Sequence, residues 1–261
     1  MFIFKNRQNT YKRKFQNKAQ TSFFVVIGLI MFISMIIGFF IYNKIRTAKI
    51  EEEAKISELS SQAEEIEKFA NDCIRKVSFE GLKRLGQTGG YIDVPSLINF
   101  KGTGFWYLDE VNIQPFLNQT QERLLSYINT NVPTCIDEQK ITQLGFEIEK
   151  RQIKTSIEFG TSDVTIGVTY PIKLTKEKFT KEFSRFFNTF DIRYRATFEA
   201  ATEVNERLFD ADFDVREPLK KLDYLKNLDF DVTYKIPEAG VITFTITDKK
   251  SLTPTTELYT F

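Results

Sequence analysis

Residues that could carry out chemistry are scarce in this chain. Its 261 residues include no histidine, which is the commonest general base and the commonest metal ligand of proteins. A serine nucleophile would then need a lysine as its base. No Ser-x-x-Lys window precedes a helix with a glycine-rich turn that could form an oxyanion hole. We therefore expect a protein that is not an enzyme, with no catalytic residue and no cofactor.

Three aspartates form the strongest candidate for a metal site. Asp210, Asp212 and Asp214 alternate as acids do at the start of a calcium-binding loop. The glycine expected at the sixth loop position is Val215, and the bidentate glutamate expected at the twelfth position is Lys221. These departures favour a helix end with solvated acids, and we predict no metal site.

One pair of carboxylates has a spacing that suits acid–base chemistry. Glu147 and Glu149 lie two positions apart on a predicted strand and therefore share a face, with Arg151 in line. Such a pair can serve as general acid and base in glycoside hydrolysis. The wet face of a sheet places acids in the same way without a catalytic role, and this second interpretation is favoured.

The glycines of residues 86–89 have the spacing of a loop that contacts phosphate or RNA. No Gly-Lys-Ser or Gly-Lys-Thr follows, and the segment leads into a predicted strand. The backbone at a helix end also requires glycine, so we predict that Gly86 caps a helix and that a turn follows it.

An aromatic pair is the candidate for ligand contact. Trp106 and Tyr107 follow Gly102 and Gly104, which leave backbone exposed beside the two rings. Aromatic side chains can stack against a sugar or a peptide, and they can equally fill the core of a domain. Both interpretations of Trp106 and Tyr107 stay open from the sequence.

The rest of the chain is arranged on either side of an apolar stretch at residues 23–42, FFVVIGLIMFISMIIGFFIY, which contains no charged residue. At about 1.5 Å of helical rise per residue it spans roughly 30 Å, the thickness of the hydrocarbon core of a bilayer. The sequence therefore predicts a single-pass transmembrane helix whose partner is the lipid bilayer.

Charge is distributed unevenly around this span. Residues 1–22 carry six basic residues and no acid, although the net charge of the chain is only +1. The side of a span that is richer in Lys and Arg normally stays in the cytoplasm. We predict a basic cytoplasmic tail or leader at residues 1–22 that contacts lipid headgroups and no nucleic acid, and a C-terminal part outside the cytoplasm. The sequence identifies no protein partner.

Two features beyond the span agree with this orientation. Asn118 begins the one Asn-x-Thr sequon of the chain and is a candidate glycosylation site, and the only two cysteines, Cys73 and Cys135, also follow the span. The cysteines are either buried thiols or, outside the cytoplasm, a disulfide that contributes roughly 3–4 kcal/mol.

Lys18, Ala19 and Gln20 come shortly before the span. A basic residue, a small residue and then Gln ahead of an apolar helix resembles the class III signal of archaeal type IV pilin-like proteins, which a prepilin peptidase cuts before the apolar segment. The resemblance implies a cut between Ala19 and Gln20. Many pilins have Glu at the fifth mature position, where this chain has Phe24, and an uncut signal anchor is the alternative.

A stalk helix is predicted at residues 43–85, because Pro is absent there and Glu, Lys, Ala and Ile are frequent. Its apolar residues recur at alternating intervals of three and four, which is the pattern of an a/d seam. The seam consists of Ile56, Leu59, Ala63, Ile66, Ala70, Cys73 and Val77. It can pair with another copy or lie on the chain's own domain, and we expect the first half to be stalk and the second half to be core.

Residues 86–261 are predicted to form an extracytoplasmic domain. Asn118 should cap a helix that ends at Pro133, and another helix should cover residues 192–210. Strands are predicted at residues 91–94, 105–107, 153–159, 164–170, 183–191, 230–236 and 242–246. The fold class is α+β: a transmembrane helix that continues into a long stalk helix, then an antiparallel β-sheet domain with packing helices.

The segments GQTGGYID, VPTCID, VTIGVTYPIKLTK and VITFTITDKKS resemble an uncharacterised family of single-pass archaeal cell-surface proteins, many of which share a pilin-like N-terminus. The resemblance implies an extracytoplasmic domain in which Cys73 and Cys135 are paired, and it implies no reaction. The expected function is that of a membrane-anchored cell-surface protein of structural or adhesive type, with pilin-like self-association through the apolar helix and the 56–77 seam. The alternative is an extracytoplasmic ligand-binding or assembly-accessory module of a membrane complex.

Overall fold

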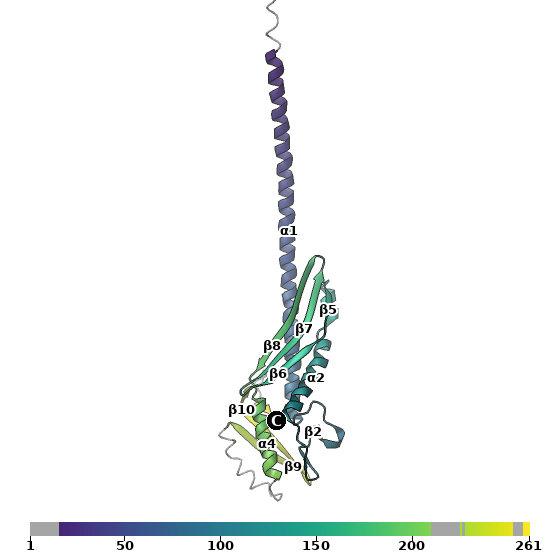
Figure 1. The fold of residues 1–261 in the computed structure, drawn as a ribbon, viewed down its shortest axis with the longest axis vertical. Coiled ribbons are helices and arrows are strands. Elements are labelled where there is room, and N and C mark those ends of the chain that lie inside the picture. Colours follow the sequence, from purple (N-terminus) through teal and green to yellow (C-terminus); the bar gives the residue numbers. More distant parts are fainter. Residues whose placement is uncertain (1–15, 210–224, 226–227, 253–257) are drawn as a thin grey trace, which may run out of the picture. The chain divides into compact units, whose positions relative to one another are not determined.

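The protein has an α+β fold, in which a long N-terminal helix is followed by antiparallel sheets and shorter helices (Figure 1). The computed structural model describes residues 16–209, 225, 228–252 and 258–261. The chain forms two compact units, Met1–Leu59 and Ser60–Phe261.

Helices and groups of strands follow one another along the described part of the chain. The helices are α1 (Gln16–Gln87), the 3₁₀ turn η1 (Ser96–Ile98), α2 (Leu117–Cys135), α3 (Glu138–Gln143) and α4 (Tyr194–Phe209). The strands are β1 (Asn99–Phe100), β2 (Thr103–Gly104), β3 (Tyr107–Leu108), β4 (Val111–Asn112), β5 (Glu147–Lys150), β6 (Lys154–Phe159), β7 (Val164–Lys176), β8 (Phe179–Phe190), β9 (Phe230–Glu238), β10 (Val241–Leu252) and β11 (Leu258–Thr260).

In the first unit, α1 carries the apolar stretch of residues 23–42. Its large side chains are exposed, for example Phe24 at 66% and Met35 at 74%. The helix begins at Gln16, so the last part of the predicted 1–22 tail is already helical. A helix that is apolar on every side is typical of an apolar environment rather than of water.

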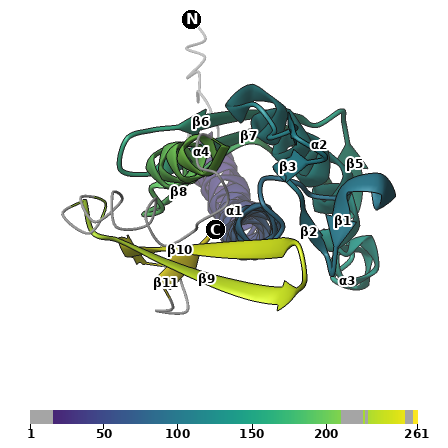
Figure 2. The same cartoon turned by 90° about the horizontal axis from the view of Figure 1, so that it is seen from below.

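In the second unit, the last part of α1 belongs to the hydrophobic core. The five seam residues from Ala63 to Val77 are at most 7% exposed, whereas Ile56 in the first unit is 50% exposed. Figure 2 shows α1 between β7 on one side and β10 on the other. The second half of the seam lies on the chain's own domain as expected, but burial already begins in the first half, at Leu59, which is 6% exposed.

The end of α1 differs from the prediction at Gly86. The helix passes Gly86 and ends at Gln87, and the left-handed residues are Gly89 (φ 71°) and Gly90 (φ 84°). The amide of Gly90 donates to the carbonyl of Leu85 at 2.7 Å and closes the helix end. Gly86 is needed for a different reason: a Cβ there would lie 2.3 Å from the carbonyl oxygen of Thr260.

Two predicted short strands are wrong. Residues 91–94 contain a bend at residues 92 and 93 and no strand, and of residues 105–107 only Tyr107 is in a strand. The structure instead has two tiny hairpins, β1 with β2 and β3 with β4, each of two residues per strand. Turns at Lys101 (φ 51°) and Asp109 (φ 49°) form these hairpins, and alternation cannot be recognised over two residues.

The boundaries of α2 also differ from the prediction. Phe116 is the N-cap, and its amide donates to Oε1 of Gln119 at 3.1 Å, so Asn118 is inside the first turn. The helix continues through Pro133 to Cys135. Proline removes one backbone hydrogen bond of the helix. This loss affects only the last turn, because the helix ends two residues later.

The larger sheet has β7 at its centre. β8 pairs with one edge of β7 over almost its full length, and β5 and β6 pair in succession with the other edge, all antiparallel. The strands are longer than predicted, since β7 continues to Lys176 and β8 begins at Phe179. β8 is left as an edge strand (Figure 1).

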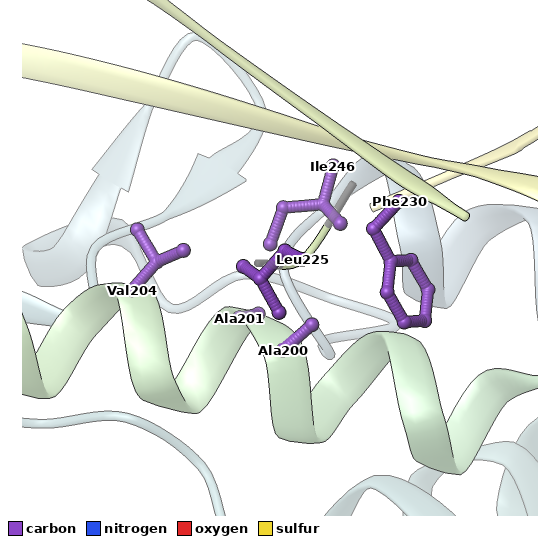
Figure 3. Close-up of a cluster of buried hydrophobic side chains, with 6 residues drawn as sticks. All are labelled: Ala200, Ala201, Val204, Leu225, Phe230 and Ile246. Carbon is purple, nitrogen blue, oxygen red and sulfur yellow. The ribbon is translucent and has the colours of Figure 1, made fainter. Parts of the chain in front are cut away.

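The smaller sheet has the order β11-β10-β9 and packs on α4. Figure 3 shows α4 presenting Ala200, Ala201 and Val204 to Phe230 and Ile246 of this sheet. The two alanines leave room for the strands to approach the helix closely. Leu225, in a cluster with these residues, is 2% exposed.

Candidate functional site

The apolar part of α1 is a candidate membrane anchor. Among the described residues, one helix is long and apolar enough to cross a bilayer, and its most apolar window is 0% buried. Ala19 and Gln20, the predicted processing junction, lie within the first turns of α1. This uncovered apolar surface suggests membrane anchoring.

Cys73 and Cys135 form a disulfide, with 6.0 Å between their Cα atoms. It joins α1 to the last residue of α2 across 62 residues of sequence. Cys73 is 5% exposed, whereas Cys135 borders an open hollow of about 630 Å³ together with Phe69 and Pro133. The bond therefore fixes the seam of α1 to α2, and only its Cys135 side faces solvent.

Trp106 lies in a cluster of aromatic side chains. Its ring centre is 5.3 Å from that of Phe198 and 5.5 Å from that of Phe261, and its Nε1 donates to the carbonyl of Gly89 at 2.8 Å. Packing and hydrogen bonding thus already occupy the indole ring. Tyr107, on β3, is half-buried.

The two strand carboxylates lie on the surface of β5. Glu147 and Glu149 are exposed, and Oε2 of Glu149 is 3.0 Å from Nζ of Lys173. The hydrogen bond from Lys173 lowers the pKa of Glu149. Arg151 follows the strand and lies 4.0 Å from Glu182. The arrangement is that of exposed ion pairs on the wet face of a sheet.

The predicted acid cluster Asp210, Asp212 and Asp214 lies outside the described residues. Within the ranges that the structure describes, no three His, Cys, Asp or Glu side chains are placed to hold a metal ion. Asn118, the predicted glycosylation site, is exposed on the first turn of α2, where its Oδ1 accepts from the amide of Gln119 at 2.9 Å.

A buried charged network was not anticipated from the sequence. Asp248 and Ser251 are 0% exposed, and Nε of Arg193 donates to Oδ2 of Asp248 at 2.9 Å. A second guanidinium nitrogen of Arg193 and the Ser251 hydroxyl also donate to this carboxylate. The Asp248 hydrogen bond raises the pKa of Arg193. The signal in the sequence is Asp248 itself, a charged residue at an inward position of an apolar alternation.

The network ties the start of α4 to the smaller sheet. The guanidinium of Arg193 also lies over the ring of Phe230, 4.9 Å from its centre, and donates to the carbonyl of Leu228 at 3.2 Å. Because every group in it has a partner inside the protein, this network has the character of a structural clamp.

No protein-family model, curated protein or solved structure matches the chain.

The structure brings Cys73 and Cys135 together and joins Trp106 to the core of the second unit. It does not bring Asn118 or the β5 carboxylates to these groups: α2 carries Asn118 at its opposite end from Cys135. Phe187 is 71% exposed on β8, and no pattern in the sequence marks it as a site residue.

Proposed function

We propose that this protein is a membrane-anchored surface protein of structural or adhesive type. The supporting observation is the uncharged helix at residues 23–42, whose large side chains have no cover and which follows a basic segment. In this proposal the helix crosses the bilayer once, the N-terminus is cytoplasmic and the second unit is extracytoplasmic.

The disulfide and the sequon support the same orientation. Disulfides persist in oxidising compartments and are rare in the cytoplasm, which favours an external position for Cys73 and Cys135. Asn118 is exposed and therefore accessible to a glycosylating enzyme. The proposal includes no catalytic role.

The pilin-like form of the proposal rests on the resemblance at Ala19 and Gln20. In this form a peptidase removes residues 1–19, and the apolar helix then assembles with other copies. The 56–77 seam contributes less to assembly than its pattern suggests, because the seam residues from Ala63 to Val77 are buried within their own unit. Ile56 and the apolar helix remain for contacts between copies.

A second candidate is an extracytoplasmic ligand-binding or assembly-accessory module. The observation that favours it is the exposed ring of Phe187 on the open face of the larger sheet, which borders an open hollow of about 370 Å³. In this version the helix is an anchor only, and no filament forms.

Two measurements on native membranes test these proposals. External protease added to intact cells should digest the second unit, whereas a domain that is cut only after permeabilisation contradicts the external orientation. The intact mass then separates the versions. A chain that starts at Gln20 supports the pilin-like form, and an intact Met1 removes it while leaving the surface anchor in place.

A further inference from the structure

The larger sheet has one buried and one open face. Ile157, Ile166 and Phe186 point to the buried face and are at most 7% exposed. The alternate residues point the other way, and the strand register places them in three rows across β6, β7 and β8. The rows are Glu158, Thr165 and Thr189; Ser156, Gly167 and Phe187; and Lys154, Thr169 and Arg185.

Phe187 is the single large apolar side chain in these rows. A Cβ built on Gly167 would lie 3.1 Å from Cε1 of Phe187 and 2.8 Å from Oγ of Ser156, so the ring leans over the glycine toward the next strand. The ring is nevertheless 71% exposed. It forms a platform, surrounded by hydroxyl and charged side chains, that no element in the described part of the chain covers.

Phe187 and Arg185 also border an open hollow of about 370 Å³ beside β8. The wall opposite β8 is made by the α1 residues Glu64, Glu67 and Lys68. Its volume is at the small end of the range for ligand sites, which is about 300–1,000 Å³. The platform and the hollow are therefore neighbours that share two side chains.

The lining of the hollow includes two acids, Glu64 and Glu67, and two cations, Lys68 and Arg185, and Lys181 adds a third cation beside the acids. Nζ of Lys181 lies 3.4 Å from Oε1 of Glu64 and 3.7 Å from Oε2 of Glu67, so one lysine compensates the two acids in part. The side chains of Lys68 and Arg185 have no hydrogen bond or ion pair within the described residues. Two unpaired cations thus flank an exposed aromatic ring.

We propose that this surface binds an acidic oligosaccharide. A pyranose ring stacks on Phe187, since an aromatic face attracts the positively polarised C–H groups of a sugar. The carboxylate of the sugar lies between Lys68 and Arg185, because guanidinium groups bind carboxylates through two parallel hydrogen bonds. Ser156 and Thr189 meet the sugar hydroxyls at the rim.

A second copy of this chain fits the surface less well. A stable interface buries about 800 Å² per partner around an apolar centre, and these rows offer a single large apolar side chain. The surrounding hydroxyls would lose water against another protein, whereas a sugar supplies hydroxyls that replace that water. The chemistry of the rim therefore favours a glycan.

This inference deepens the adhesive role and rests on the proposed function for its biological setting. Its test does not depend on the topology, because binding is measured on the purified full chain in detergent micelles. If the sugar does not bind, the results of the protease and mass measurements are unaffected. If those measurements contradict the proposed topology, the measured affinity for the sugar is still valid.

The test is calorimetric titration of the full chain with tri-galacturonic acid, and with the neutral trisaccharide maltotriose for comparison. We expect saturable binding of the acidic sugar that weakens as the salt concentration rises. Phe187→Ala and Arg185→Gln should each weaken binding by about tenfold.

Matched controls are Phe116→Ala, which removes a ring that is 68% exposed on α2, and Lys235→Gln, which removes a cation from the smaller sheet. Both should bind as the parent does. Circular dichroism confirms that each variant is folded, and Arg185→Gln keeps the test valid where Phe187→Ala unfolds.

Three results would overturn the proposal. These are no saturable binding of tri-galacturonic acid, equal binding of maltotriose, and equal loss in the control variants. Concentration-dependent dimers in the absence of sugar that disappear in Phe187→Ala would assign the surface to a second copy instead.

Discussion

Asp248 is a fully buried carboxylate whose oxygens accept hydrogen bonds from Arg193, Ser251 and the amide of Lys250. Such a group contributes to stability only while its donors are present, because an unpaired charge in the interior is costly. The side chain of Arg193 is 17% exposed, so it too depends on this partner. Most of the free energy of unfolding that is lost on removing Asp248 is therefore expected to come from the unpaired charge of Arg193.

Asp248→Ala should lower the free energy of unfolding by about 3 kcal/mol, because Arg193 is left nearly buried without its anion. Urea unfolding of the full chain in detergent measures this change. The fluorescence of Trp106, the one tryptophan of the chain, reports it from inside the core. Asp229→Asn is the matched control, since it breaks the exposed pair with Lys250 and should leave the midpoint nearly unchanged.

Two buried tyrosines should set the alkaline limit of the fold. Burial raises the pKa of Tyr194 and of Tyr259 above its usual value of 10.0. The neutral phenol is the favoured form in the native state, so its stabilisation is complete below pH 10 and is lost as the pH rises toward the raised pKa values. Unfolding at high pH should therefore coincide with ionisation of both phenols.

Ultraviolet difference absorbance of phenolate, recorded together with circular dichroism, checks this prediction. Tyr259→Phe should remove one late-titrating phenol and cost about 1 kcal/mol, since Oη of Tyr259 donates to the carbonyl of Leu82 at 2.9 Å. Ionisation of all tyrosines in one early step, with native circular dichroism, would contradict the buried environment.

The contact of α1 with β11 depends on a helical glycine. A Cβ on Gly86 would lie 2.3 Å from the carbonyl oxygen of Thr260 and 2.8 Å from Oη of Tyr259. Backbone lies on both sides of this contact, so the strand itself must move to relieve the overlap.

Gly86→Ala should therefore destabilise the second unit by about 1–3 kcal/mol, although alanine is the better helix former. Thermal unfolding measured by circular dichroism tests the sign. Gly38→Ala is the control, because nothing lies within 4 Å of a Cβ at that position, and it should cause no loss. A stabilised Gly86→Ala variant would show that β11 does not pack against α1.

Long periodic elements could be predicted from the sequence, and short ones could not. The alternation of residues 164–170 and 230–236 predicted β7 and β9, and the three-four spacing of the seam predicted the buried half of α1. The hairpins around Lys101 and Asp109 have two residues per strand, which is too short for any period.

Of the candidate sites, one could be predicted from the sequence and others depend on contacts between distant parts of the chain. Pairing of Cys73 with Cys135 followed from the resemblance and is present in the structure. The Phe187 platform could not be predicted, because it depends on the cross-strand register that puts Phe187 beside Gly167. Gly86 was assigned to the wrong role, since the strand that requires a glycine there lies at the other end of the sequence.

The second unit is held together by links between distant parts of the chain. The disulfide between Cys73 and Cys135 closes a sequence separation of 62 residues, and restricting a loop of this length in the unfolded chain contributes about 4 kcal/mol. Reduction should therefore weaken the domain as one cooperative body rather than free a local segment.

Replacing both cysteines by serine should lower the free energy of unfolding by about 4 kcal/mol. Urea unfolding of the double variant measures this, with the oxidised parent in the same detergent as reference. Parent protein treated with dithiothreitol should unfold at the same urea concentration as the double variant. An unchanged midpoint in both samples would show that the bond adds nothing to stability.

The hydrogen bond from Tyr259 to Leu82 joins residues 177 positions apart and has a consequence for biosynthesis. Leu82 leaves the ribosome long before Tyr259. The apolar face of the last turns of α1 therefore stays exposed until the strands that cover it have been synthesised. In the proposed topology this exposed state occurs outside the membrane, during export. The core is completed only after β11 has been made, and the nascent domain needs protection from aggregation until that moment.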